Sequence, residues 1–280
     1  MNINLPCVVS IAGTDPSGGA GIQADIKSIS ATGSYAATVI TVLVAQNTQG
    51  VQSVYSIPAD FVMNQINSVF EDLKVSAVKI GMLHSYDIIN LVSSALEKYQ
   101  PKNIILDPVM AAKDDTLLLD LAKLDFFKSR LFSLIDVITP NLFETEKIIC
   151  KKIISLDNMA QAAKEIGRQY KINVLIKGGH FKEDKSSDVL YSFINESINW
   201  FHSMRIDTKN THGTGCTLSS AIASFLAQGY SLLESVKRAK LYLTNSLKSG
   251  NNIKIGRGRG PVDHFYFLRE TNKRKELIFE

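Results

Sequence analysis

Short apolar runs alternate along this chain with longer segments whose apolar residues recur at helical spacing. Parallel strands need long crossover connections, usually helices, so this alternation predicts a mainly parallel central sheet with helices on both faces. The expected strands are Leu5–Ala12, Ala37–Ala45, Ala77–Ile80, Asn103–Asp107, Val137–Thr139 and Val174–Lys177, with an antiparallel hairpin of Val189–Ile194 and Ile198–Met204. The expected helices are Gly21–Thr32, Pro58–Leu73, Tyr86–Tyr99, Leu142–Cys150, Asn158–Tyr170, Cys216–Gln228 and Leu232–Lys248.

The composition is that of a globular protein with one domain. The chain has 280 residues, of which 45% are hydrophobic and 21% are charged. It contains no repeat, low-complexity segment or linker, so we expect residues 1–280 to form a single domain. The net charge of +4 is modest, and the basic C-terminal tail lacks interleaved aromatic residues. We therefore expect no nucleic-acid partner.

The cysteines and the N-terminal segment indicate in which cellular compartment the protein is found. Cys7, Cys150 and Cys216 are dispersed and form no CxxC pair, which indicates neither a disulfide framework nor a zinc site. A reducing cytoplasm fits this pattern. The apolar run Leu5–Ala12 is too short to span a bilayer, so we expect no contact with a membrane.

The segment NTHGTGC, residues 210–216, is a glycine-rich turn that leads into an amphipathic helix, which Gly229 is expected to end. Backbone N–H groups at a helix N-terminus lack partners within the helix, and together with the helix dipole they form an anion site. Cys216 would stand in the first turn, where a thiol tends to have a lowered pKa. Taken alone, the segment fits a tight turn before a buried cysteine better than an active site.

Residues at the carboxyl ends of the expected strands, polar except for Met82, reverse that preference. Asp15, Gln46, Met82 (after Gly81), Asp107 and Asn141 all stand at this edge, where open parallel sheets bind their ligands.

The glycine-rich segment between Ala12 and Gly21 follows the first strand and opens the first helix. It lacks the acidic residue of a dinucleotide fingerprint, since no acid occurs between Asp25 and Asp60, and it lacks the Gly-Lys-Ser/Thr of a P-loop. We interpret it as a flexible loop over a small-molecule pocket, with Asp25 turned toward that pocket. The alternative is a plain turn between strand and helix, although a turn needs fewer glycines.

Oxygen ligands and a lysine add a possible phosphate site. Asp107 and Asn141 end two strands, and Glu144 lies nearly one turn into the next helix. Mg²⁺ binds through few carboxylates, waters and substrate phosphates, so these residues are candidates for its site. A helix cap formed by Asn141 and Glu144 explains them equally well. Lys177 ends a buried strand and can meet a phosphate, or it can extend its ammonium group to solvent.

His212 invites a test for hydrolase chemistry. No Gly-x-Ser-x-Gly nucleophile elbow occurs, and a Cys216–His212 protease pair would not explain the phosphate-type features. We interpret His212 as a residue that orients the glycine loop.

These segments, in this order, resemble the hydroxymethylpyrimidine/phosphomethylpyrimidine kinases of thiamine biosynthesis, within the ribokinase-like superfamily. The resemblance extends from Val9 to about Asp263. The matching segments are SIAGTDPSGGAGIQADIK, VITVLVAQNTQGV, KIGML, ILDPVM, ITPNLFETE, VLIKGGH and NTHGTGCTLSSAIA. It implies a ribokinase-like three-layer sandwich, a homodimer, and two successive phosphate transfers from ATP. The first acceptor is the hydroxymethyl oxygen of 4-amino-5-hydroxymethyl-2-methylpyrimidine, and the second is the resulting monophosphate.

The resemblance also implies roles for single residues. The residues that match the family's pyrimidine pocket are Gly13, Asp25, Gln46, Met82 and Val109. The residues that match its anion hole are Gly213, Thr214 and Gly215, with Cys216 as the catalytic base. The residues that match its phosphate and Mg²⁺-ATP region are Lys177, Asp107, Asn141 and Glu144.

The sequence departs from the family in one place and leaves rival functions open. The lysine-serine-glycine flap expected after Met110 reads Ala111-Ala112-Lys113 here, which puts flap closure in doubt. Pyridoxal kinase is the first alternative, and Gln46 favours the aminopyrimidine because an amide can both donate to and accept from its edge. A non-catalytic binding protein is the second alternative. The residues whose joint retention argues against it are Cys216, Lys177, Asp107 and Glu144.

Overall fold

The computed structural model describes residues 4–110, 120–179 and 184–272. Within these residues the main sheet has the strand order β10-β9-β8-β7-β6-β5-β1-β2. Its strands are β1 (Cys7–Ala12), β2 (Tyr35–Ile40), β5 (Val75–Ile80), β6 (Ile104–Leu106), β7 (Val137–Ile138), β8 (Asn173–Ile176), β9 (Lys185–Ser192) and β10 (Ser197–Met204). In this sheet β2, β1, β5, β6, β7 and β8 run parallel to one another, while β9 and β10 are each antiparallel to their neighbours.

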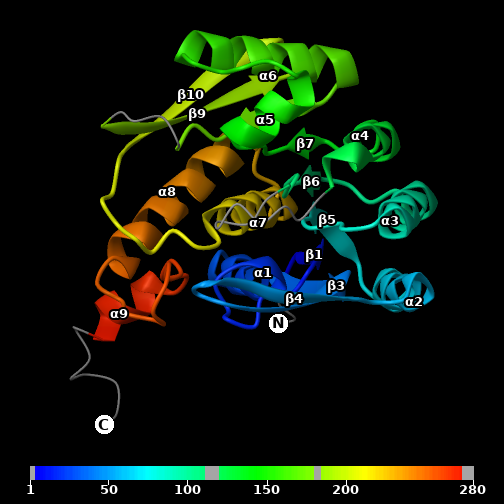
Figure 1. Cartoon of the computed structure of the whole chain (residues 1–280), viewed down its shortest axis with the longest axis horizontal. Coiled ribbons are helices and arrows are strands. Elements are labelled where there is room, and N and C mark those ends of the chain that lie inside the picture. Colours follow the sequence, from blue (N-terminus) through cyan, green and yellow to red (C-terminus); the bar gives the residue numbers. More distant parts are fainter. Residues whose placement is uncertain (1–3, 111–119, 180–183, 273–280) are drawn as a thin grey trace.

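Helices cover both faces of this sheet, so the domain has three layers (Figure 1). One face carries α2 (Ala59–Phe70), α3 (Tyr86–Tyr99), α4 (Leu124–Leu131), α5 (Leu142–Ile149) and α6 (Leu156–Tyr170). The other carries α1 (Gly21–Ala31), α7 (Thr214–Ala227) and α8 (Leu232–Gly250), with α9 (Tyr266–Asn272) against α8. A short 3-10 helix, η1 (Leu121–Lys123), precedes α4.

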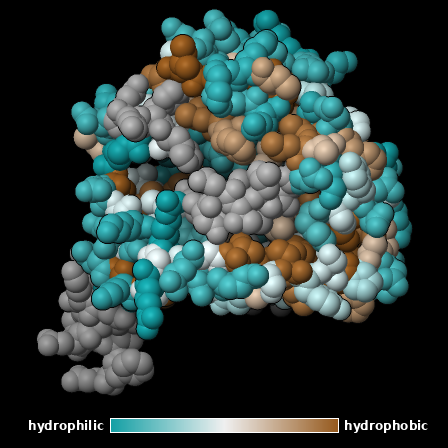
Figure 2. Space-filling view, in the orientation of Figure 1, coloured by the Kyte–Doolittle hydropathy of each residue, from teal (hydrophilic) through white to brown (hydrophobic). Residues whose placement is uncertain are grey.

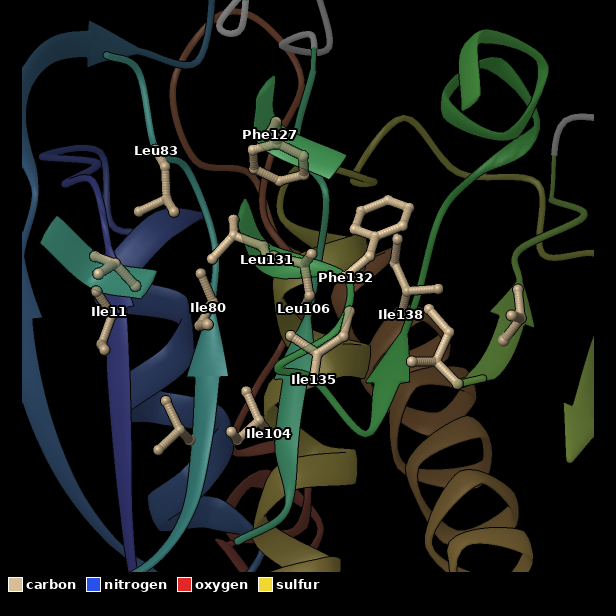
Figure 3. Packing of buried hydrophobic residues seen from close by; sticks show 14 of the residues in the cluster. Ile11, Ile80, Leu83, Ile104, Leu106, Phe127, Leu131, Phe132, Ile135 and Ile138 are labelled. Carbon is tan, nitrogen blue, oxygen red and sulfur yellow. The ribbon is translucent and has the colours of Figure 1, made fainter. Parts of the chain in front are cut away.

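Neighbouring residues of a strand serve opposite cores, because successive side chains point to opposite faces. Val9 packs under the α2–α6 layer, whereas Val8 packs under α1, α7 and α8. Figure 3 shows the first of these cores, with Ile11, Ile80 and Leu106 of the sheet facing side chains such as Leu131 of α4. The two cores fix the sheet between its helices, and they thereby fix the carboxyl ends of its strands.

The predicted fold class is confirmed, and so is the hairpin of β9 and β10. The expected strand over 37–45 is wrong, because the chain leaves the main sheet at Thr41. The Thr41 amide donates to Ala12 O at 3.0 Å, and its hydroxyl donates to Met82 O at 2.8 Å. The chain then forms a separate two-stranded sheet of β3 (Val42–Asn47) and β4 (Gly50–Ser56).

Other differences are smaller. The sequence prediction lacks β4, α4 and α9. The end of α7 agrees with the prediction, since Gly229 follows the helix with a φ of 90°. The altered flap at Ala111–Thr116 lies outside the described residues. In the parts of the chain that are described, no helix has the length and apolar character needed to cross a membrane.

Candidate active site

The N-terminus of α7 begins directly after the glycine-rich loop. Gly213 is its N-cap residue, with a φ of 77° in the left-handed region that favours glycine. A Cβ on Gly213 would lie 1.7 Å from Gly19 O, so the first glycine loop packs directly against this one. The whole of α7 is described, and it has neither a side-chain cap nor an acidic residue in its first turn. The N–H groups of the turn that starts at Thr214 are therefore suited to an anion.

Lys177 and Asp107 lie against this turn. Lys177 Nζ is 2.7 Å from Asp107 Oδ1. A Cβ on Gly215 would lie 3.2 Å from that ammonium nitrogen and 3.4 Å from Asp107 Oδ2, which places the pair at the helix N-terminus. Burial alone would lower the pKa of Lys177, but the carboxylates of Asp107 and Glu144 outweigh burial and raise it. A fixed positive charge thus stands beside the first turn of α7.

Asn141 and Glu144 form a capping box at the start of α5. Asn141 Oδ1 accepts from the Glu144 amide at 2.9 Å, and Glu144 Oε2 accepts from the Asn141 amide at 2.7 Å. The helix-cap alternative is therefore confirmed. Burial and the nearby charge of Asp107 raise the pKa of Glu144 to about 7, although Lys177 opposes them. A cation beside Asp107 and Glu144 would relieve this repulsion between two buried carboxylates.

The donor set at this point suits Mg²⁺ rather than a metal held by the protein alone. Among the described residues there is no group of three or more histidine, cysteine, aspartate or glutamate side chains that could hold a metal ion. Mg²⁺ keeps several waters and commonly uses one or two carboxylates together with substrate phosphates. Asp107 and Glu144 offer buried carboxylate oxygens beside the N-terminus of α7, a donor set that fits that ion.

Cys216 lies in the first turn of α7 and is half-buried. The N-terminus of α1 lies near it as well, because the backbone of Gly21 lowers the pKa of the thiol. Burial raises the pKa of Cys216 to about 11, against the lowering effects of Lys79 and of the Gly21 amide. Desolvation therefore outweighs the helix N-terminus, where a thiol tends to have a lowered pKa. At neutral pH the group is a thiol.

Apolar side chains pack around Gly13 at the carboxyl end of β1. Gly13 packs against Val42 and Met82, since a Cβ on Gly13 would lie 2.7 Å from Val42 Cγ1 and 3.4 Å from Met82 Sδ. Gly13 O also accepts from the Ile22 amide at 3.0 Å, which joins this apolar wall to the start of α1. Gln46 on β3 is half-buried and lies near Asp15 of the first glycine loop, where it helps to lower the pKa of that carboxyl group.

The structure thus brings most of the expected pocket residues to one sheet edge. Val109 belongs to the same edge, because its amide donates to Asp107 O at 2.8 Å.

Asp25 is placed differently from the expectation. Its side chain is fully buried below the pocket, where it accepts from Ser10 Oγ, Ser220 Oγ and Lys79 Nζ. The reason is visible in α1, where Asp25 shares the buried stripe of Ile22 and Ile29 at helical spacing. Asp25 is therefore directed to the core, where it holds other side chains, and its own side chain has no exposed surface in this structure.

Comparison with known proteins settles which family this arrangement belongs to. The sequence model of the phosphomethylpyrimidine kinase family matches residues 15–263. The hydroxymethylpyrimidine/phosphomethylpyrimidine kinase of Escherichia coli is 44% identical over 92% of this chain and 97% of its own length. The chain belongs to the phosphomethylpyrimidine kinase family.

Two further relatives show how widely the kinase domain is used. A thiamine biosynthesis bifunctional protein of Geobacter sulfurreducens is 42% identical over 95% of this chain, which spans 54% of that protein's length. An ADP complex of Bacillus subtilis pyridoxal kinase has a TM-score of 0.86 and 35% identity, covering 95% of this chain and 99% of the other. The fold is thus shared by phosphomethylpyrimidine kinases and a pyridoxal kinase.

Sequence reasoning missed two elements of this kinase site. Lys79 is fully buried at the end of β5, and the signal for it was the same one used for Lys177: a charged residue in an apolar strand. The second is the contact of His212 Nε2 with Asp15 Oδ2 at 2.8 Å, which joins the two glycine loops. This contact agrees with the interpretation of His212 as a loop-orienting residue. It also lowers the pKa of Asp15, against the effect of burial.

Proposed function

We propose that the protein transfers the γ-phosphate of ATP to the hydroxymethyl oxygen of 4-amino-5-hydroxymethyl-2-methylpyrimidine, and then phosphorylates the monophosphate to the diphosphate. Family membership supports a kinase, and the names of the E. coli and G. sulfurreducens relatives support the place in thiamine biosynthesis. The observation that carries the proposal is the Lys177–Asp107 pair against Gly215, at a helix N-terminus without a side-chain cap.

Charge neutralisation at the phosphate is the main task of such a site, since phosphoryl transfer depends on positioning and electrostatics more than on covalent chemistry. The N–H groups of Gly213, Thr214 and Gly215 would face the equatorial oxygens of the γ-phosphate. Lys177 would donate to the same phosphate. Asp107 and Glu144 would hold Mg²⁺, with Asn141 fixing Glu144, and the ion would supply further charge neutralisation when bound.

The transfer itself moves one proton and one phosphoryl group. The hydroxymethyl oxygen forms a bond to the γ-phosphorus while the bond from that phosphorus to the β–γ bridging oxygen breaks, and ADP leaves with the electron pair. Cys216 Sγ would accept the hydroxyl proton from the attacking oxygen. Because its pKa is about 11, the thiolate is scarce at neutral pH but strongly basic once formed.

Selectivity for the ring would come from Gln46 beside the apolar wall of Gly13 and Met82. An amide offers both a donor and an acceptor to an aminopyrimidine edge, and a ring without the amino group leaves one of them unpaired. Pyridoxal is the competing acceptor, since the B. subtilis pyridoxal kinase shares this fold at 35% identity.

The proposed reaction is tested by offering ATP with the aminopyrimidine, its monophosphate and pyridoxal in parallel, and resolving the products by mass spectrometry. We expect mono- and diphosphate from the pyrimidine and little product from pyridoxal, with Cys216→Ala as the inactive control. If pyridoxal phosphate were the main product, the function of the protein would instead be assigned to vitamin B6 salvage. No product from any acceptor would favour a binding protein.

We also propose that the protein is a homodimer. The β3–β4 hairpin stands apart from the main sheet and exposes Leu43, Val54 and Tyr55, which are 43%, 46% and 68% exposed. Figure 2 shows hydrophobic side chains gathered over this hairpin, low in the view. Exposed apolar groups of this kind mark contact surfaces. Light scattering on the Leu43→Asp variant is expected to show a monomer where the wild type shows a dimer.

A cytoplasmic location is proposed with it. Cys7, Cys150 and Cys216 are all free thiols in the described structure, and a reducing compartment would keep them so.

A further inference from the structure

The β3–β4 hairpin, which carries Gln46, is packed only at its base. Among the described residues, its two strands pair with each other and with no further strand. The Thr14 amide donates to Val42 O at 3.1 Å, and Thr14 Oγ1 accepts from the Val44 amide at 2.9 Å. Val42 and Val44 are buried against Met82, but no residue from 45 to 56 is buried. A two-stranded hairpin is marginally stable by itself, so the part beyond Val44 needs a second support.

The turn of the hairpin has such a support in the loop that follows α8 (Figure 1). Thr48 O accepts from the Arg259 amide at 2.9 Å, and Thr48 Oγ1 accepts from the Gly258 amide at 3.0 Å. The approach is close, because a Cβ on Gly258 would lie 1.9 Å from Thr48 O. A Cβ on Gly256 would lie 2.3 Å from Thr48 Oγ1. Glycine at these two positions therefore lets the two backbones meet.

The loop that holds Thr48 is itself attached to the segment before α7. Asn210 Nδ2 donates to Gly250 O at 2.6 Å and to Ile253 O at 2.7 Å. The His212 amide donates to Gly260 O at 3.1 Å. The contact with Thr48 thus connects the turn of the hairpin to the glycine-rich segment at the start of α7.

Gln46 lies close to the supported turn. It is two residues before Thr48, and it pairs across the hairpin with Val51. The register of the two strands shifts between Ala45 and Gln46, so a regular ladder from the base does not fix its position. A shift of this kind changes the direction of a side chain. Where the Gln46 amide points therefore depends on how the turn is held.

We infer that residues 256–259 form a latch on the β3–β4 hairpin, and that Gly258 and Thr48 are positioning residues for Gln46. The inference rests on the proposed function for one point only, the contact of Gln46 with the pyrimidine. The latch itself concerns the protein without substrate, and it can be tested without measuring kinase activity.

The first test measures hydrogen exchange of the amides of residues 42–56 by mass spectrometry, in the protein without ligands. Gly258→Ala places a methyl group against Thr48 O, and residue 258 has no positive φ that would strain alanine by itself. We expect the hairpin amides to exchange about tenfold faster, whereas those of α6 keep the wild-type rate.

A matched pair at Thr48 isolates one hydrogen bond. Thr48→Val keeps the shape of the side chain but cannot accept from the Gly258 amide, so we expect exchange about fivefold faster. Thr48→Ser keeps the hydroxyl group and should exchange like the wild type.

The second test measures affinity by calorimetric titration with the aminopyrimidine and, separately, with ATP and MgCl₂. We expect Gly258→Ala to weaken pyrimidine binding about tenfold and to leave ATP binding within about threefold of the wild type. In a Gln46→Met background the amide is gone, so Gly258→Ala should weaken pyrimidine binding less than about threefold. A residue that merely stabilises the fold would weaken both ligands and would act equally in both backgrounds.

Several results would overturn the inference: unchanged hairpin exchange in Gly258→Ala, unchanged pyrimidine affinity, or an equal loss for both ligands or in both backgrounds. If Gly258→Ala does not fold, as judged by circular dichroism, Thr48→Val against Thr48→Ser decides on the same measurements. A wild type that binds no pyrimidine would refute the proposed function, and the exchange rates alone would then decide whether the latch exists. A working pyrimidine kinase with unchanged exchange would refute the latch and leave the proposed function standing.

Discussion

Two lysine–aspartate pairs contact α7, and their geometries are nearly the same. Lys79 Nζ lies 2.8 Å from Asp25, and Lys177 Nζ lies 2.7 Å from Asp107. Each lysine stands at the carboxyl end of a strand, Lys79 within β5 and Lys177 directly after β8. Consecutive serines of α7 complete the correspondence, since Ser219 donates to Asp107 and Ser220 to Asp25.

The pairs differ in their access to solvent. Lys79 and Asp25 are sealed at 0% exposure, whereas the Lys177 side chain is 15% exposed at the open edge of the sheet. The sealed pair can only hold α7 and act through the electric field. The open pair can exchange part of its contact for a phosphate oxygen. The same two side chains thus serve to position the helix in one place and to bind a ligand in the other, and burial decides which.

The largest expected effect comes from Cys216, which stands in the first turn of α7 and belongs to neither pair. Cys216→Ala is expected to lower kcat by roughly 10²–10⁴-fold, because it removes the proton acceptor. Pyrimidine binding should be largely kept, since Gly13, Gln46 and Met82 are untouched. Steady-state kinetics and calorimetric titration measure the two quantities. Turnover at the wild-type level would remove Cys216 as the base.

The next largest effect is a difference between the two pairs in how much each stabilises the fold. Lys79→Met leaves Asp25 as an uncompensated buried charge, and we expect the free energy of unfolding to fall by roughly 3–5 kcal/mol. Lys79→Met/Asp25→Asn should recover most of this loss. Lys177→Met should cost less than Lys79→Met, since water can reach the open pair. Urea denaturation measures all three variants. An equal loss at both lysines would break the distinction between a sealed and an open pair.

The pH dependence of turnover tests how the thiol responds to these charges. A base acts when deprotonated, and burial raises the pKa of Cys216 to about 11. The thiolate fraction therefore grows about tenfold per pH unit below that value. We expect kcat/KM for the pyrimidine to rise between pH 7 and 9 with no plateau. A plateau already reached at pH 8 would contradict a thiolate base with this pKa.

The smallest effect is expected at Gln46, which touches neither pair. Gln46→Met replaces the amide by an apolar side chain, so the aminopyrimidine loses its paired hydrogen bonds. We expect the ratio of kcat/KM for pyrimidine over pyridoxal to fall about tenfold or more. Competition between the two acceptors in one reaction measures the ratio directly. An unchanged ratio would show that other residues set the selectivity.

The fold could be predicted from the sequence because each strand and helix carries its own periodicity. The predicted helix Tyr86–Tyr99 matches α3 at both ends, and Ser85 caps its N-terminus. The break at Thr41 could not be predicted, because it depends on hydrogen bonds to Ala12 and Met82, which are distant in sequence. The tertiary contact overrides a continuous β-type pattern.

In the site, the features that adjacent residues determine could be predicted from the sequence, and the contacts between residues far apart in the chain could not. The N-terminus of α7 and the Asn141–Glu144 cap follow from adjacent residues. The pairing of Lys79 with Asp25 joins residues far apart in the chain, so no pattern of residue spacing predicts it. The pKa of Cys216 also depends on how deeply the fold buries the thiol, which the sequence does not state.

The division between a sealed and an open pair is tested most directly by ATP binding. Calorimetric titration with ATP and MgCl₂ would compare Lys177→Met with Lys79→Met/Asp25→Asn, which keeps the sealed site neutral. We expect Lys177→Met to weaken ATP binding about tenfold or more, through loss of a charge-assisted phosphate contact. The double variant should stay within about threefold of the wild type. Equal weakening in both, or none at Lys177, would contradict the assignment of Lys177 to the phosphate and Lys79 to the helix.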